Sequence, residues 1–230
     1  MSSRARGAVT LVLVAAVLGL GLAIAVHHDP AAGADRSTLR WVLDHRTPWV
    51  THLATALSDV FSPTWVAVAA VVVAVVLIRR DRRLDRGARV LGVVAIAGAL
   101  AEVLKVAVDR LRPPEMDQVG SPEAAMSFPS GHVTGTCALV LGLAVIVTAR
   151  RRARVIAVAV AAVVSVAVGA SRLYLGAHWL TDVVASVAVA VAAVLAAPLL
   201  VDAILTAIRP HLPVRLRTMV GGSTPAGATR

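Results

Sequence analysis

The run VVASVAVAVAAVLAAPLLVDAILTA, residues 183–207, has Asp202 as its only charged side chain and is long enough to cross a bilayer as a helix. Five further apolar runs precede it, at residues 8–26, 60–78, 90–108, 132–149 and 155–171. The chain of 230 residues is 58% hydrophobic and 16% charged, a composition typical of membrane proteins. We therefore expect an all-α polytopic membrane protein, with a single domain (1–230) built as a bundle of six transmembrane helices.

Positive charge is concentrated in two of the segments that join these runs. The segment between the second and third runs and the segment between the fourth and fifth hold Arg79, Arg80, Arg82, Arg83, Arg86, Arg89, Arg150, Arg151, Arg152 and Arg154. Short loops rich in arginine stay in the cytoplasm, so we expect a multi-pass protein of the cell membrane with both termini cytoplasmic. The net charge of +10 then follows from topology and indicates no nucleic-acid partner.

The long segment between the first two runs, residues 27–59, is amphipathic. Its apolar residues recur near helical spacing: Leu39, Val42, Leu43, Val50, Leu53 and Leu57. This pattern, broken at Pro48, predicts a helical segment that lies at the membrane interface.

The two ends of the chain require separate interpretations. The first run follows Arg4 and Arg6 and precedes Ala32-Gly33-Ala34, which is similar to a signal-peptide cleavage site. At about 19 residues the run is longer than the roughly 7 to 15 of a signal-peptide core, which favours an uncleaved membrane anchor. Residues 208–230 are expected to form a flexible cytoplasmic tail.

Three short polar stretches interrupt the apolar chain, all on the predicted extracytoplasmic side. The last, SRLYLGAHWLTD at residues 171–182, holds His178 and Asp182 four positions apart. On a helix the two would share a face, so the carboxylate could accept a hydrogen bond from one imidazole nitrogen and leave the other as a nucleophile. Helix capping explains the same spacing. Arg172 adds a planar guanidinium suited to two phosphate oxygens.

The first stretch, KVAVDRLRP at residues 105–113, places Lys105 and Arg112 seven positions apart. They would align on one face if the third helix continued that far. Cations at the end of a membrane helix can also simply extend toward the interface. Either Asp109 or Glu102 could pair with a basic residue here, and the sequence leaves this open.

The middle stretch, PSGH at residues 129–132, stands directly before the fourth apolar run. A helix that begins here would present free backbone amides and a partial positive charge to an anion, and Gly131 would allow close approach. Ser130 either caps the helix or donates its hydroxyl to phosphate. His132 could act as a general acid.

Together the three stretches resemble the motifs of the type 2 phosphatidic acid phosphatase (PAP2) superfamily, which is related to vanadium haloperoxidases. The family patterns K-x6-R-P, P-S-G-H and S-R-x5-H-x3-D are matched in order and spacing by Lys105, Arg112, Pro113, Pro129, Ser130, Gly131, His132, Ser171, Arg172, His178 and Asp182. The resemblance covers residues from about 90 to 200.

The resemblance implies a site and a mechanism. His178 would attack phosphorus and form a phosphohistidine, Asp182 would orient it, and His132 would protonate the leaving group and then activate water. The phosphoryl oxygens would be bound by Lys105, Arg112, Ser130, Gly131 and Arg172. No metal or other cofactor is expected, because cations and a helix terminus replace the metal and the sequence shows no metal-ligand cluster.

The resemblance further implies a lipid phosphate as substrate, with its tail among the membrane lipids. The candidates are polyprenyl diphosphate, phosphatidylglycerophosphate and phosphatidate, and spans dominated by alanine and valine favour polyprenyl diphosphate. A lipid phosphotransferase would pass the phosphoryl group from His178 to another lipid. A transporter would line a pathway with charge, whereas here the motif charges gather at one face of the membrane.

Overall fold

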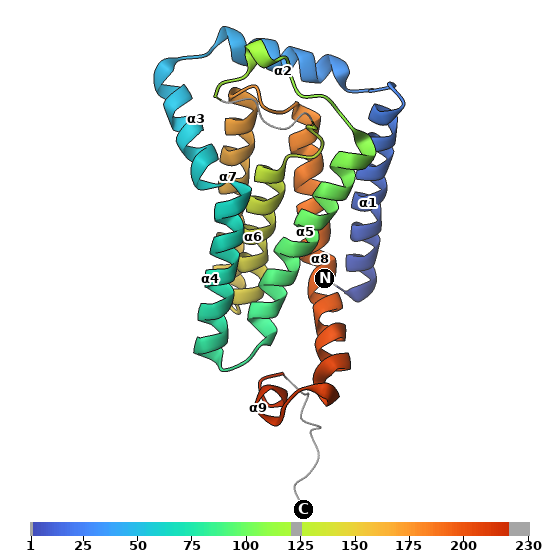
Figure 1. The fold of residues 1–230 in the computed structure, drawn as a ribbon, viewed down its shortest axis with the longest axis vertical. Helices are drawn as coiled ribbons and strands as arrows, with labels where there is room; N and C mark the ends of the chain where they lie inside the picture. Colours follow the sequence, from blue (N-terminus) through green and yellow to red (C-terminus); the bar gives the residue numbers. More distant parts are fainter. Residues whose placement is uncertain (1, 121–125, 221–230) are drawn as a thin grey trace, which may run out of the picture.

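The computed structural model describes residues 2–120 and 126–220, and helices dominate these residues. Six long helices form the bundle: α1 (Ser3–Ala25), α4 (Pro63–Asp81), α5 (Asp85–Val108), α6 (Gly131–Val147), α7 (Arg151–Tyr174) and α8 (Leu180–Ile208). They run roughly along the long axis of the molecule (Figure 1). The expectation of an all-α bundle is confirmed.

Within the described residues, five helices are long and apolar enough to cross a membrane: α1, α4, α5, α7 and α8, the last continuous with residues to His211. The sixth apolar run forms α6, which has 17 residues. A helix of that length rises about 26 Å, slightly less than the roughly 30 Å of a bilayer core. The structure therefore shows an integral membrane protein with at least five candidate spans.

The segment predicted to be amphipathic forms two helices, α2 (Ala32–Asp44) and α3 (Pro48–Val60). Pro48 is the first residue of α3, a position where its missing N–H has no helical partner to lose. In Figure 1, α2 lies across one end of the bundle, and α3 descends beside α7. Helix α2 thus covers the end where α7 finishes and α8 begins, and α3 flanks α7.

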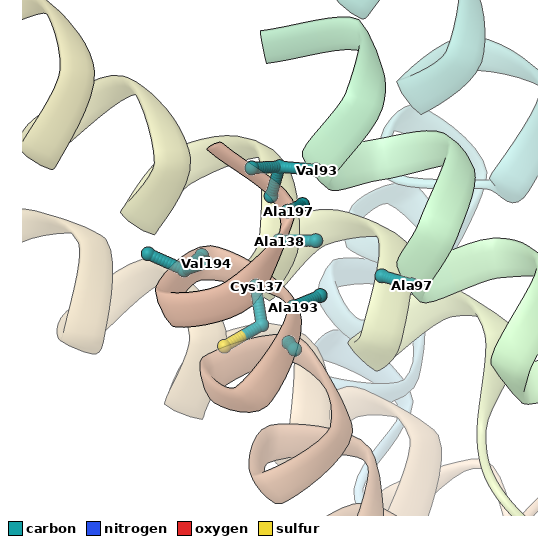
Figure 2. Close-up of a cluster of buried hydrophobic side chains, with 8 residues drawn as sticks. Val93, Ala97, Cys137, Ala138, Ala193, Val194 and Ala197 are labelled. Carbon is teal, nitrogen blue, oxygen red and sulfur yellow. The ribbon is translucent and has the colours of Figure 1, made fainter. Parts of the chain in front are cut away.

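Helix α6 lies at the centre of the bundle and contacts α4, α5, α7 and α8. Small side chains make this close packing possible. Figure 2 shows the buried cluster where α5, α6 and α8 meet, made of Val93, Ala97, Cys137, Ala138, Ala190, Ala193, Val194 and Ala197. The single cysteine is therefore a small buried residue of a helix.

The other end of the bundle contains the arginine-rich turn between α4 and α5. Arg89 of α5 makes two hydrogen bonds with Asp202 of α8, at 2.7 and 2.9 Å. In Figure 1 the beginning of α1 and the end of α8 lie toward this end, away from α2.

The first part of the expected tail has local structure. After α8 come the turn η2 (Arg209–His211) and α9 (Val214–Arg217), and the N–H of Leu84 donates to the carbonyl of Met219 at 2.9 Å. Residues 221–230 lie outside the described residues. Flexibility of the tail stays a prediction.

Two glycines of α5 provide a matched test of this packing. A Cβ at Gly92 would lie 2.4 Å from Cγ2 of Val201 on α8, whereas a Cβ at Gly98 would meet nothing within 4 Å. We expect Gly92→Ala to destabilise the protein by about 1–3 kcal/mol through overpacking. Gly98→Ala should be neutral or stabilising, because alanine favours helices. Thermal unfolding in detergent checks both, and equal effects of the two substitutions would contradict the close α5–α8 contact.

Candidate active site

The three polar stretches meet at the end of the bundle that α2 covers. Helix α5 ends at Val108, and Asp109 follows in the left-handed conformation with φ of 46°. Lys105 is therefore in the last turn of α5, whereas Arg112 lies beyond the helix in an irregular segment. The condition for the two cations to share a helix face is therefore not met, because the helix stops before Arg112.

His178 is almost fully buried and makes contacts through both ring nitrogens. Nδ1 lies 2.9 Å from the carbonyl oxygen of Ser127 and 3.4 Å from Oδ2 of Asp182. Both neighbours are acceptors, so Nδ1 carries the proton in the neutral ring and Nε2 keeps its lone pair. A guanidinium N–H of Arg112 donates to Nε2 across 3.0 Å. The nitrogen that keeps its lone pair is thus defined, and it faces a cation.

His178 and Asp182 come together in a different way from the expected shared helix face. Helix α8 begins at Leu180, so His178 lies in the preceding loop and Asp182 in the first turn. Oδ2 of Asp182 accepts the N–H of Trp179 at 2.9 Å. Asp182 therefore both caps the start of α8 and contacts His178. The capping hydrogen bond helps to hold the carboxylate in place beside the imidazole.

Burial lowers the pKa of His178 below that of a free imidazole, and Arg112 and Arg172 lower it further against the opposing effect of Asp182. At neutral pH the ring is therefore neutral.

The PSGH stretch forms the beginning of α6, with Ser130 at the N-cap. The N–H of Ser130 donates to Oγ of Ser186 on α8 at 2.8 Å. Oγ of Ser186 also lies 2.7 Å from the carbonyl oxygen of Asp182. The start of α6 is thereby fixed beside the first turn of α8.

The hydroxyl of Ser130 has an unusual environment. The residue is fully buried, its side chain makes no capping hydrogen bond, and within residues 2–120 and 126–220 its Oγ has no hydrogen-bond partner. Burial of a hydroxyl without a partner costs about 1–3 kcal/mol. Although Ser130 occupies the N-cap position, its hydroxyl does not cap the helix. The role that stays open to the hydroxyl is donation to a phosphate.

Lys105 reaches the same helix start. Its Nζ lies 3.5 Å from where a Cβ would stand at Gly131, so an ammonium and the N-terminus of α6 converge on one place. Nζ also pairs with Oε1 of Glu102 at 2.7 Å. Glu102, not Asp109, is therefore the partner of Lys105 among the described ion pairs, and it is largely exposed.

Arg172 is buried near the end of α7, and one terminal nitrogen of its guanidinium donates to Oγ of Ser58 on α3. Both it and Arg112 are close enough to His178 to influence its charge. His132, the second residue of α6, is half-buried beside Gly131.

A second set of contacts holds the loop between α7 and α8. Arg46 donates to the carbonyl oxygens of Tyr174 and Asp117, at 3.1 and 2.6 Å. Gly176 has φ of 67°, and a Cβ there would lie 2.3 Å from the carbonyl oxygen of Asp117. Only glycine fits this turn, which brings the chain from Arg172 to His178.

Several residues of the site have no place in the sequence motifs. The principal one is Arg110, which contacts Asp182, Thr181, Asp29 and Asp35. A signal was available, because an arginine near the end of an apolar run is costly unless it is paired. The nearest acidic residues after the first run are Asp29 and Asp35.

The described residues contain no group of three or more histidine, cysteine or acidic side chains arranged to hold a metal ion. The expectation that no metal takes part stays a prediction.

The chain matches the model of the PAP2 superfamily over residues 86–205. It therefore belongs to this superfamily and is a membrane phosphatase, an enzyme that hydrolyses phosphoric esters. The resemblance inferred from the three motifs is confirmed.

Two comparisons identify similar proteins. Phosphatidylglycerophosphatase B of Bacillus subtilis (strain 168) is 26% identical over 166 residues, which are 70% of this chain and 80% of the relative. The crystal structure of a transmembrane PAP2 type phosphatidylglycerolphosphate phosphatase from Bacillus subtilis matches with a TM-score of 0.73 at 24% identity. The match covers 86% of this chain and 96% of that one, so the fold is that of a transmembrane PAP2 protein.

The buried position of His178 predicts its titration. Because burial and two arginines lower its pKa, the ring should lose its proton below the value of about 6.5 of a free histidine. Nitrogen NMR of histidine-labelled protein in detergent would measure this, with the signal assigned by its loss in His178→Gln. Titration at or above the free value would contradict the described environment.

Proposed function

We propose that this protein removes phosphate from a phosphomonoester or diphosphate of a membrane lipid, at the extracytoplasmic face, through a phosphohistidine on His178. The observation that carries the proposal is the state of the His178 ring. Its Nδ1 is held by the carbonyl of Ser127 and the carboxylate of Asp182, which leaves Nε2 as the nucleophile.

In the first step, Nε2 of His178 attacks phosphorus and the bond from phosphorus to the leaving oxygen breaks. His132, next to Gly131 at the start of α6, donates a proton to that oxygen. The positive charge that develops on the imidazole is stabilised by Asp182, 3.4 Å from Nδ1.

The negative charge of the transition state is stabilised by groups already in place. Lys105 and the amide of Gly131 lie together at the start of α6, and the partnerless hydroxyl of Ser130 is available to donate. Arg112 and Arg172 supply guanidinium groups close enough to His178 to lower its pKa. Arg112 contacts Nε2 at 3.0 Å, so it must turn from that nitrogen to a phosphoryl oxygen as substrate binds.

In the second step, water attacks the phosphohistidine. His132, now deprotonated, accepts a proton from that water, and the bond between phosphorus and Nε2 breaks to release inorganic phosphate. Both histidines return to their starting states.

Several features support a lipid substrate from the outer side. Trp41, Trp49 and Trp65 are all more than 60% exposed and lie on α2, α3 and the first turn of α4, as expected for interfacial anchors. The arginine-rich turn between α4 and α5 is at the opposite end (Figure 1), which favours a cytoplasmic position for that end. In this arrangement α6 is the sixth span, and α2 lies at the interface, from which α3 descends beside α7.

Both relatives are named for phosphatidylglycerophosphate. We therefore propose to test this lipid first, ahead of polyprenyl diphosphate and phosphatidate.

Phosphate release from these three lipids by the purified protein tests the proposal. We expect turnover of at least one lipid, undiminished by a metal chelator, and a loss of at least about 10³-fold in His178→Ala, because no other group replaces the nucleophile. His52→Ala, an exposed histidine of α3, is the matched control and should retain activity.

Three outcomes would contradict this account. Full turnover by His178→Ala would show that His178 is not the nucleophile. Inhibition by a chelator would show that a metal ion takes part in the reaction. Transfer of phosphate to a labelled lipid acceptor, without free phosphate, would identify a phosphotransferase.

A further inference from the structure

Arg110 lies just beyond the end of α5, and its side chain is only 10% exposed. One terminal nitrogen donates to Oδ1 of Asp182 at 2.7 Å and to Oγ1 of Thr181 at 2.6 Å. The other donates to Oδ2 of Asp29 at 2.7 Å and to Oδ2 of Asp35 at 2.6 Å. The four N–H groups of its terminal nitrogens therefore meet four protein oxygens, and neither nitrogen has a donor left for phosphate.

The charges of this cluster are unequal. One guanidinium faces three carboxylates, of which Asp35 and Asp182 are 2% and 0% exposed. Burial alone would lower the pKa of Arg110, but Asp182 and Asp35 raise it above its ordinary value. Arg110 therefore stays charged, and without it two buried carboxylates would lose their cation, which is strongly unfavourable.

The cluster joins α2 to the start of α8. Oδ1 of Asp35, on the first turn of α2, accepts the N–H of Thr181 at 2.9 Å, and its Oδ2 accepts the hydroxyl of Thr181 at 2.7 Å. Arg110 stands within 5.5 Å of the centre of the Trp179 ring, a cation–π distance. The first turns of α2 and α8 are thus held against each other through Arg110 and Asp35.

We propose that Arg110 is a positioning residue for catalysis, which fixes the carboxylate of Asp182 behind His178 and makes its orientation depend on the docking of α2 through Asp35. The assignment rests on the proposed function in one respect, namely that His178 is the nucleophile. Arg110 acts through Asp182 and is distinct from Lys105, Arg112 and Arg172, which are placed to meet the phosphoryl group.

The charge arrangement predicts a direction for the effect of losing Arg110. His178 is faced by Asp182, Arg112 and Arg172, and Arg110 partly neutralises Asp182 from the other side. Replacing Arg110 with a neutral side chain leaves Asp182 more strongly negative toward the imidazole. Protonated His178 then becomes more stable, so the acidic limb of the pH–rate profile should move to higher pH.

The test compares Arg110→Met, Arg110→Lys and Asp35→Asn in the purified full-length protein. For Arg110→Met we expect kcat to fall roughly 10- to 100-fold, the scale of one lost hydrogen bond to a charged group. KM should change less than about threefold, because the proposed phosphate-binding side chains remain. Arg110→Lys should restore the position of the acidic limb but only part of kcat, since an ammonium cannot contact four oxygens. Asp35→Asn should also lower kcat.

Arg89→Met is the matched control, since Arg89 also makes a two-point ion pair, with Asp202, far from the site. It should lower the unfolding temperature but leave kcat within about twofold and the acidic limb unmoved. The contrary outcome is that Arg110→Met loses activity while the acidic limb of its pH–rate profile stays in place and its unfolding temperature falls no more than that of Arg89→Met. In that case the role of Arg110 would be structural, and the proposal would fail.

Nitrogen NMR of His178 in Arg110→Met decides the question without turnover. A raised His178 pKa is expected, and an unchanged one would overturn the proposal. If the wild-type protein released phosphate from no lipid, the proposed function would fail, while this titration would still decide the role of Arg110.

Discussion

A carboxylate buried at the beginning of α8 joins His178, Arg110 and the first turn of that helix. Asp182 accepts the N–H of Trp179, faces Nδ1 of His178 and receives a hydrogen bond from Arg110. A fully buried anion is tolerated only when such partners surround it. These contacts define where α8 starts, which way the His178 ring points and where the segment after α5 must pass. Through Arg110, they also define where α2 lies.

The bundle supplies the rigidity that this arrangement needs. Alanine and valine side chains let α5 and α8 pack closely against α6 (Figure 2). Ser186 then joins the first turn of α8 to Ser130 at the N-cap of α6. The proposed nucleophile at the start of α8 and the proposed anion-binding start of α6 are thereby held in one position, which is the condition for electrostatic preorganisation.

Much of this could be predicted from sequence because membrane insertion restricts the chain so strongly. Apolar run length located six helices to within a few residues, and the motif spacing identified the family. The details that failed were those set by tertiary contacts. Helix α5 ends before Arg112, so helical periodicity does not relate Arg112 to Lys105. His178 lies outside α8, so periodicity does not relate it to Asp182 either. The contacts of Arg110 could not be predicted from the motifs, because its partners Asp29 and Asp35 come from a segment more than 70 positions earlier.

The central claim is that His178 carries the phosphoryl group during turnover, and trapping of the phosphoenzyme tests it most directly. A lipid substrate with a radiolabelled phosphate would be mixed with the protein, quenched in alkali to preserve phosphohistidine, and mapped by peptide mass spectrometry. The structure predicts a label on His178, at the nitrogen that faces Arg112. A label on any other residue, or turnover with no labelled enzyme at any time, would contradict it.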